Sequence, residues 1–225
     1  MNAGKDSEAT VVADSALIVI LACVAGGAVL GWLVKLLARW LVTLPWAPFQ
    51  GPAKLLSSFP EPGLTIGVVA VGVIAGLLLG LTAVHESLTV AVSDTQVTLS
   101  TRDETQVVER GEIALAFKDG KQLVLLGHHG RETAREETDL SAKRLSRAFT
   151  KHGYGWAETD PHDDAYRLWV PGASGLPDGA NAVFAARAQA LKADKGDDAR
   201  ELRKELARFG VVVRDRDKRQ YWRMA

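Results

Sequence analysis

Two long stretches without charged side chains constrain this chain most. Ser15–Val34 contains no ionisable group except the thiol of Cys23, and Leu64–Val84 contains none at all. A helix needs roughly 20 apolar residues to cross the hydrocarbon core of a bilayer. Both stretches meet that length, and uncharged runs this long are unusual in a soluble core. The sequence therefore predicts an integral membrane protein with two transmembrane helices.

The first span is expected to cover about residues 15–42 and the second about residues 64–84. Asp6, Glu8 and Asp14 outnumber Lys5 in the segment before the first span, whereas a signal peptide begins with a positive segment. We therefore interpret the first stretch as a retained span. The connection up to about residue 63 contains several prolines and apolar residues, and we expect it to lie on the membrane surface.

Small residues recur at helical spacing on both predicted spans. They stand at Cys23, Gly27 and Gly31 on the first span and at Gly72, Gly76 and Gly80 on the second. Such faces let helix backbones approach closely, so that van der Waals contact replaces the hydrophobic drive that is missing in lipid. The pattern predicts either packing of the two spans against each other or a homodimer through the glycine face of the second span.

From about Leu88 the sequence changes to alternating apolar and polar residues. The runs 88–93, 95–100, 105–110, 112–117 and 122–127 are typical of short strands. Asp139 is expected to cap a helix whose apolar side carries Leu140, Leu145 and Phe149. Antiparallel strands followed by one helix predict a small β half-barrel with a capping helix, which resembles the bacterial pleckstrin-homology (PH)-like fold. Glutamates are interspersed among its basic residues, so a structural or protein-contact role is favoured over recognition of lipid headgroups.

Residues 153–177 form a Pro- and Gly-rich connector with four aromatic residues, which we expect to dock onto a neighbouring domain; a ligand surface is the alternative. His128-His129 and His162 with the two following aspartates lack the spacing of metal ligands and are interpreted as turn residues in solvent. No nucleophile motif or phosphate-binding loop occurs, and the only cysteine lies in a predicted span. The sequence thus predicts no catalytic residue, no metal and no cofactor.

The last segment, residues 178–225, reads as two helices capped by Asp178 and Asp197, followed by two short strands around a turn at residues 217–220. It is locally basic and carries aromatic residues near its end. Basic side chains attract RNA phosphates, and aromatic rings can stack on bases. The predicted RNA-binding residues are Arg200, Arg203, Lys204, Arg214, Arg219, Tyr221 and Trp222. The alternative is a solvated helix face with the aromatic residues in the core.

The runs Ala185–Ala188, Asp198–Leu206, Phe209–Asp215 and Tyr221–Arg223 are similar to the C-terminal domain of cysteinyl-tRNA ligases. That domain has an arginine-bearing helix, a second helix with an "AD-x-IR-x-x-L" pattern, a "G-I-x-V-x-D" strand and a tryptophan near its end. Here the Ala-Asp pair is reversed to Asp198-Ala199. The resemblance implies a fold that contacts a tRNA anticodon in the ligase, without its catalytic or zinc-binding parts.

The whole chain resembles the YqeB-like bacterial membrane proteins. The likeness is carried by His152-Gly153-Tyr154-Gly155-Trp156, Asp160-Pro161 and Trp169-Val170-Pro171-Gly172. It implies two spans, a PH-like module, this connector and the ligase-like tail. The expected organisation is α+β: an N-terminal tail (1–14), a transmembrane hairpin (15–87), a PH-like domain (88–152), a connector (153–177) and a domain of a helical hairpin plus two strands (178–225).

Orientation rests on two signals that disagree. Lys35, Arg39 and Lys54 on the loop side favour a cytoplasmic loop by the positive-inside rule. The resemblance to an RNA-contacting module favours a cytoplasmic tail, and two spans put both termini on one side. We expect a multi-pass protein of the cytoplasmic membrane with both termini in the cytoplasm.

Two functions from different classes follow from this organisation. The first hypothesis is a non-enzymatic, membrane-anchored scaffold or binding protein whose protein partner the sequence does not identify. The second is a membrane-tethered RNA- or tRNA-binding protein that acts through the basic terminal domain. In both, the lipid bilayer is a partner of the two spans.

Overall fold

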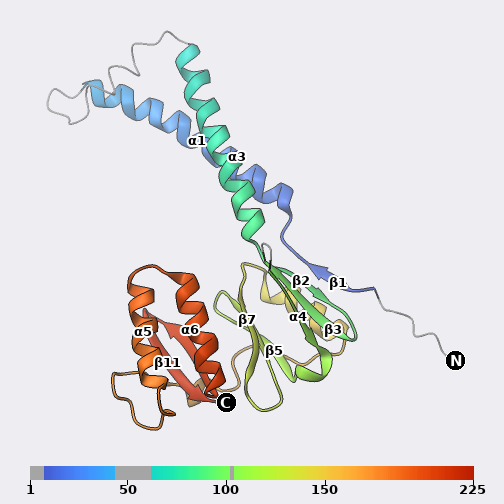
Figure 1. Ribbon diagram of the computed structural model, residues 1–225. Coiled ribbons are helices and arrows are strands. Elements are labelled where there is room, and N and C mark those ends of the chain that lie inside the picture. The colour runs from blue at the N-terminus through green and yellow to red at the C-terminus, as the bar shows by residue number, and fades with distance from the viewer. Residues whose placement is uncertain (1–7, 44–61, 102–103) are drawn as a thin grey trace. The chain divides into compact units, whose positions relative to one another are not determined.

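The computed structural model describes residues 8–43, 62–101 and 104–225. The chain forms two compact units (Figure 1). One is the membrane hairpin, residues 13–89 together with 100–104, and the other comprises the remaining N-terminal residues, 90–99 and 105–225. Most of the connection between the spans, which we expected to lie on the membrane surface, falls outside the described residues, as does Lys54.

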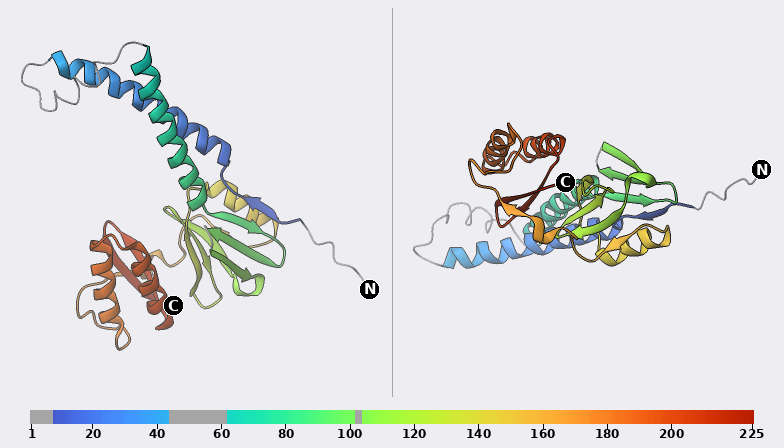
Figure 2. Two further views of the ribbon diagram at one scale, coloured as in Figure 1. Left: turned by 45° about the horizontal axis from the view of Figure 1, so that its top comes forward. Right: turned by 90° about the horizontal axis from the view of Figure 1, so that it is seen from below.

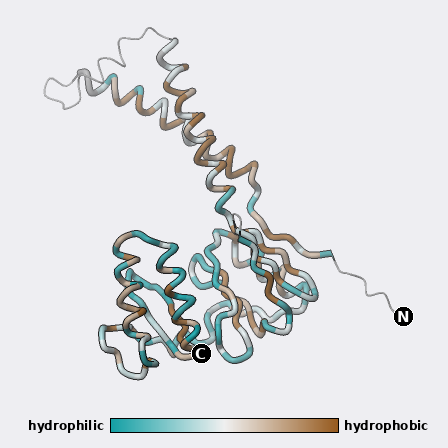
Figure 3. The backbone as a smooth tube through the Cα atoms, viewed as in Figure 1, coloured by the Kyte–Doolittle hydropathy of each residue, from teal (hydrophilic) through white to brown (hydrophobic). Residues whose placement is uncertain are grey.

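Two long helices form the hairpin, α1 (Ala16–Thr43) and α3 (Gly63–Glu86). Both are long and apolar enough to cross a membrane, as the uncharged stretches predict. Apolar residues dominate both helices (Figure 3). Leu17 and Val71 are 67% and 68% exposed within the chain, whereas a core helix of a soluble protein would bury such side chains. This exposure favours lipid as their surroundings.

The glycine faces of α1 and α3 lie against each other. A methyl group built at Gly27 would overlap the carbonyl of Gly72, and one at Gly76 would overlap the carbonyl of Cys23. At Gly31 it would stand 2.6 Å from the carbonyl oxygen of Val68, and Gly80 lies against Cys23 and the preceding turn of α1. This arrangement matches the first of the two alternatives predicted from the sequence, in which the two spans pack against each other. A homodimer through the same face would have to displace α1.

The PH-like domain begins before the hairpin. Its first sheet has the order β1 (Thr10–Val12), β2 (Thr89–Val92), β3 (Gln96–Thr101) and β4 (Glu104–Glu109). β1 pairs antiparallel with β2, and Val12 stands opposite Val90. The hairpin is therefore an insertion between two neighbouring strands of one sheet. The sequence pattern does not predict β1, because three residues are too few to show an alternation.

The second sheet has the order β7 (Glu132–Glu137), β6 (Gln122–Leu126), β5 (Leu115–Asp119) and β8 (Trp156–Ala157). A 3-10 turn, η1 (Arg110–Glu112), leads into β5, and helix α4 (Ala142–Lys151) follows β7. Phe117, Leu125, Leu145 and Phe149 are fully buried in this domain. This confirms a PH-like half-barrel with a capping helix, and the described strands do not close into a barrel.

One local prediction in this domain is wrong, and one strand was not predicted. Helix α4 is capped by Ser141, whose hydroxyl accepts from the backbone N–H of Arg144. The predicted cap, Asp139, instead pairs with Lys121 at the surface.

The sequence does not predict strand β7, because it is an edge strand rich in charged residues. Its Arg135 is buried against Glu132 and Asp119. Burial alone would lower the pKa of this guanidinium, but hydrogen bonds and charge from the two carboxylates raise it.

Aromatic residues of the connector dock onto both domains, as predicted. Tyr154 and Trp156 each place their rings 5.8 Å from that of Phe149 in the PH-like core. Burial raises the pKa of Tyr154, although Arg110 above its ring opposes the shift. Trp169 stacks on Phe184 at 5.3 Å in the terminal domain and donates to the amide oxygen of Asn181. These aromatic residues are therefore engaged in packing.

His152, at the end of α4, binds strand β1 to the rest of the PH-like domain. Its imidazole is 2% exposed, with Nε2 2.8 Å from the hydroxyl of Thr10 and Nδ1 2.6 Å from Asp94 Oδ1. Arg110 donates to the carbonyl oxygens of both His152 and Asp94. A single buried side chain thus joins the strand before the hairpin to the turn that follows β2.

The terminal domain packs two helices on one face of a three-stranded sheet (Figure 2). The helices are α5 (Ala180–Lys192) and α6 (Gly196–Arg208), and the sheet has the order β10 (Val211–Arg216), β11 (Arg219–Met224) and β9 (Arg167–Leu168). A 3-10 turn, η2 (Asp163–Ala165), precedes β9. Phe184, Leu206, Val211, Val213 and Trp222 form the core.

The helix caps predicted at Asp178 and Asp197 are wrong. The residue before α5 is Gly179, which adopts a left-handed conformation (φ 85°), and Lys195 precedes α6. At neither helix start does a capping side chain accept a hydrogen bond from the backbone. Asp197 lies in the first turn of α6, where its charge interacts favourably with the helix dipole.

Candidate nucleic-acid interface

The strand register of the terminal domain gathers arginines on one face of its sheet. Arg214 stands opposite Tyr221, and Arg216 stands opposite Arg219. Because side chains alternate along a strand and opposite residues share a face, these four lie with Arg223 on the side turned away from α5 and α6. We call this side the arginine face. Trp222 and Gln220 point to the other side, toward the helices.

The inner part of the arginine face is already engaged. The Arg214 guanidinium lies 4.1 Å from the ring centre of Tyr166 and donates to Asp163 Oδ1 at 2.6 Å. Burial by itself would lower the pKa of Arg214, but the hydrogen bond that it donates to Asp163 raises it. Burial raises the pKa of Tyr166 to about 12, with Glu132 and Asp160 adding to the shift. Arg214 therefore holds the connector against the sheet.

The outer part of the arginine face is exposed. Asp217 and Lys218 form the turn between β10 and β11. Both have positive φ, as the central residues of a tight two-residue β-hairpin turn do. Arg216, Lys218 and Arg219 are exposed there, and no acidic side chain among the described residues pairs with them. Tyr221 lies two residues after Arg219 on the same face of β11 and is half-buried. Free cations next to an aromatic ring are the combination that suits a nucleic-acid strand.

The basic residues on the outer surface of α6 are different. Arg200, Lys204 and Arg208 are exposed, and each is paired with the acid three residues before it: Asp197 at 3.5 Å, Glu201 at 3.0 Å and Glu205 at 2.5 Å. Exposed pairs of this kind contribute little stability, but they cancel the local charge. This surface offers a phosphate less attraction than the hairpin tip does.

Arg203 faces the interior and belongs to a charge cluster. It donates a hydrogen bond to Asp215 Oδ2 at 2.9 Å. The buried Arg187 donates one hydrogen bond to each carboxylate oxygen of Asp215, at 2.7 and 2.6 Å. Burial lowers the pKa of Arg203, and the charges of Arg187 and Arg135 add to that effect. Burial alone would raise the pKa of Asp215, but hydrogen bonds and charge from Arg187 and Arg203 bring it below its ordinary value.

The structure thus separates the residues predicted to bind RNA. Arg214, Arg219 and Tyr221 share the arginine face, whereas Arg200 and Lys204 lie on α6. Arg203 is directed inward and Trp222 is buried in the core, as the alternative interpretation of the aromatic residues had it. The sequence did not single out Arg216 or Lys218. Their position beside the predicted turn was the available signal.

A membrane hairpin inserted into a PH-like sheet, followed by a small basic α+β domain, defines a class of membrane-associated proteins built from binding modules. Residues 10–157 match the family model described as YqeB-like bacterial PH domain. "Uncharacterized protein YqeB" of Bacillus subtilis (strain 168) is 38% identical over 200 residues, which cover 88% of this chain and 83% of that protein. The chain belongs to the YqeB-like family.

The terminal domain has a match of its own. Residues 173–223 match the model described as cysteinyl-tRNA ligase anticodon binding domain, which is a binding module rather than the catalytic part of that ligase. No solved structure matches this chain. Among the described residues, no group of three or more histidine, cysteine, aspartate or glutamate side chains is arranged to hold a metal ion.

Proposed function

We propose that this YqeB-like protein is a non-enzymatic, membrane-anchored scaffold or binding protein with both termini in the cytoplasm. Its main support is the pairing of β1 with β2, which enclose the hairpin. Because the hairpin is inserted between two paired strands, the chain connects the PH-like domain to one span through β1 and to the other span through β2.

Crosslinking in cells, followed by purification of the full chain and identification of what is bound, tests this proposal. We expect a defined protein or RNA partner to be recovered from one preparation to the next. Repeated recovery of the chain alone, with efficient crosslinking shown on a known complex, would contradict a scaffold or binding role.

RNA is the partner that we propose for the terminal domain. Two observations support it: the match to an anticodon-binding module and the unpaired cations of the hairpin tip. Arg216, Lys218 and Arg219 would contact phosphates, and Tyr221 would stack on a base. Arg200 and Lys204, which the sequence also suggested, would contribute less because acids on the same helix accompany them.

Substituting Arg219→Gln is expected to weaken tRNA binding by the detergent-solubilised full chain and to reduce its salt dependence. Loss of one phosphate contact lowers the slope of log affinity against log salt by about one. Fluorescence anisotropy with labelled tRNA over a range of salt concentrations measures both effects. Arg200→Gln is the matched control, since Arg200 is paired with Asp197, and should change both much less.

Two results would contradict the RNA proposal. The unaltered protein could show no salt-sensitive binding, which would remove RNA as a partner altogether. Alternatively, Arg200→Gln could reduce the slope as much as Arg219→Gln, which would mean that diffuse charge and not the arginine face attracts the RNA.

A further inference from the structure

Two aliphatic side chains are exposed beside the cations of the hairpin tip. Trp169 turns its ring toward α5, where it stacks on Phe184, and its backbone N–H donates to the carbonyl oxygen of Gln220 on β11. Because side chains alternate along an extended strand, its neighbours Leu168 and Val170 point to the arginine face. They are 41% and 51% exposed. The arginine face therefore carries exposed apolar surface as well as charge.

The strand register places these aliphatic side chains next to the aromatic ring and the cations. Leu168 stands opposite Tyr221. The same register, continued by one more backbone hydrogen bond, brings Val170 beside Arg219. The tip, residues 216–219, has the sequence Arg-Asp-Lys-Arg, so three cations outnumber one acid. The result is a surface on which apolar side chains are bordered by net positive charge.

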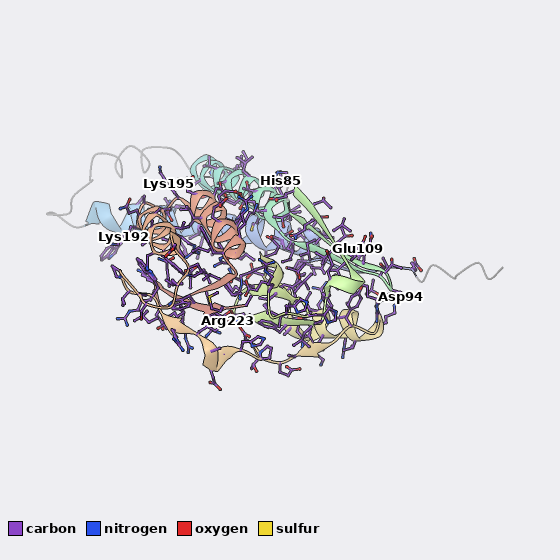
Figure 4. All side chains as sticks on the ribbon, turned by 60° about the horizontal axis from the view of Figure 1, so that its bottom comes forward. His85, Asp94, Glu109, Lys192, Lys195 and Arg223 are labelled. Atoms are coloured by element: carbon purple, nitrogen blue, oxygen red, sulfur yellow. The ribbon has the colours of Figure 1, made fainter. Side chains whose placement is uncertain are left out.

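The loop between α5 and α6 is a useful comparison, because it also has lysines beside an exposed aliphatic residue. Leu191 is 42% exposed, and Figure 4 shows Lys192 and Lys195 close together at this loop. Residues 192–198, however, contain two lysines and three aspartates, and Lys195 lies 3.8 Å from Asp198. The loop is therefore net negative. Of these two surfaces, the arginine face is the one that combines apolar side chains with surplus positive charge.

We propose that the arginine face, together with Leu168 and Val170, docks on the surface of an anionic bilayer. Cations bind acidic headgroups, while aliphatic and tyrosine side chains enter the boundary between headgroups and acyl chains. RNA offers phosphates and base faces, but it has no apolar layer to receive two aliphatic side chains. Because α1 and α3 anchor the chain, the bilayer surface also stays at high effective concentration around the terminal domain.

Docking on the bilayer occupies the same cations that RNA binding would use. Arg216, Lys218 and Arg219 cannot contact the phosphates of a lipid and of an RNA at the same time. This step rests on the proposed RNA binding: the anionic bilayer covers the RNA site, and RNA must displace the domain from the bilayer to bind. Lipid composition would thereby regulate how readily the terminal domain takes up RNA.

Fluorescence quenching of the full chain in nanodiscs tests the docking. Cys23→Ala removes the single native thiol, and Val170→Cys then carries the fluorophore. The discs contain phosphatidylcholine with or without phosphatidylglycerol, and a lipid with a doxyl quencher on its acyl chain. We expect stronger quenching in the discs with phosphatidylglycerol. Leu191→Cys in the same background is the matched control, because Leu191 is an exposed aliphatic residue in a net negative loop, and it should be quenched equally in both discs.

Removing charge from the tip measures the electrostatic part of the docking. Arg216→Gln and Arg219→Gln should each lower the ratio of docked to undocked domain about fivefold. Arg200→Gln should lower it much less, because Arg200 is paired with Asp197 on α6. A second label at Leu168→Cys keeps the test decisive if the first label disturbs the fold. Equal quenching of both labels in the two kinds of disc would overturn the proposal, as would an equal loss with Arg200→Gln.

Addition of tRNA to the anionic discs separates the failure of this proposal from the failure of RNA binding. We expect tRNA to reduce the quenching of the label at Val170→Cys, as competition for one face requires. If tRNA binds and the quenching stays unchanged, RNA does not occupy the arginine face, so the competition is overturned while the docking stands. If the quenching does not depend on phosphatidylglycerol, the docking is overturned whatever tRNA does.

Discussion

Replacing Gly76 by valine is expected to separate the two spans and to destabilise the hairpin by about 3 kcal/mol. Even a single methyl group at this position overlaps the backbone carbonyl of Cys23, and backbone cannot move aside as a flexible side chain can. The helices must therefore part, which forfeits van der Waals contact along the whole glycine face. Unfolding of the purified protein by increasing SDS, followed by circular dichroism, measures the loss.

The chain provides its own probe and its own control for this experiment. Cys23, its only cysteine, lies at the contact between the spans, so separation should speed its reaction with a small maleimide. Gly67→Val and Gly26→Val are matched controls because a Cβ atom built at either position meets nothing within 4 Å. If these controls destabilise the hairpin as much as Gly76→Val does, the contact seen here does not hold the spans together.

Asp215→Asn is expected to lower the free energy of unfolding of the terminal domain by about 3 kcal/mol, because it leaves two arginines without their anion. Arg187 is 3% exposed and Arg203 19%, so water cannot easily replace the lost carboxylate. Urea unfolding of the solubilised full chain, followed by the fluorescence of the tryptophans, measures the change. Asp197→Asn removes an exposed partner of Arg200 and should change the free energy of unfolding little.

The same carboxylate predicts a pH dependence. Arg187 and Arg203 hold the pKa of Asp215 below its ordinary value of 3.8, so the folded state binds this proton less tightly than the unfolded state does. The stabilisation is fully present above pH 3.8 and is lost as the pH falls through the lowered pKa. Asp215→Asn should lack this part of the acid destabilisation. An unchanged acid profile would mean that the cluster does not couple to folding.

The sequence predicted the elements with strong periodic signals. Both spans, the strands between residues 88 and 127 and the two terminal helices follow from regular patterns of apolar residues. It did not predict β1, because three residues carry no pattern and their partner strand lies beyond the hairpin. It missed β7 as well, since that strand is rich in charged residues and its buried Arg135 is paired with Glu132 of the same strand and with Asp119 of β5.

The candidate interface was predictable as a region but not residue by residue. Basic residues on α6 look alike in the sequence, yet the helix turns Arg203 inward while Arg200 and Lys204 face solvent with acidic neighbours. Strand alternation separates Tyr221 from Trp222 in the same way. Which cations remain unpaired depends on partners such as Asp163 and Asp215, and contacts between distant segments decide those.

The pairing of Val12 with Val90 makes biogenesis of the PH-like domain depend on the membrane step. The ribosome releases β1 first, but its neighbour in the sheet emerges only after both spans have been synthesised, so the sheet can complete itself only once the hairpin has formed. A fragment starting at residue 88 would leave β2 with a bare edge, which invites aggregation. Joining residue 12 directly to residue 90 through a two-residue Asn-Gly turn would instead preserve the register and give a water-soluble version of the PH-like and terminal domains.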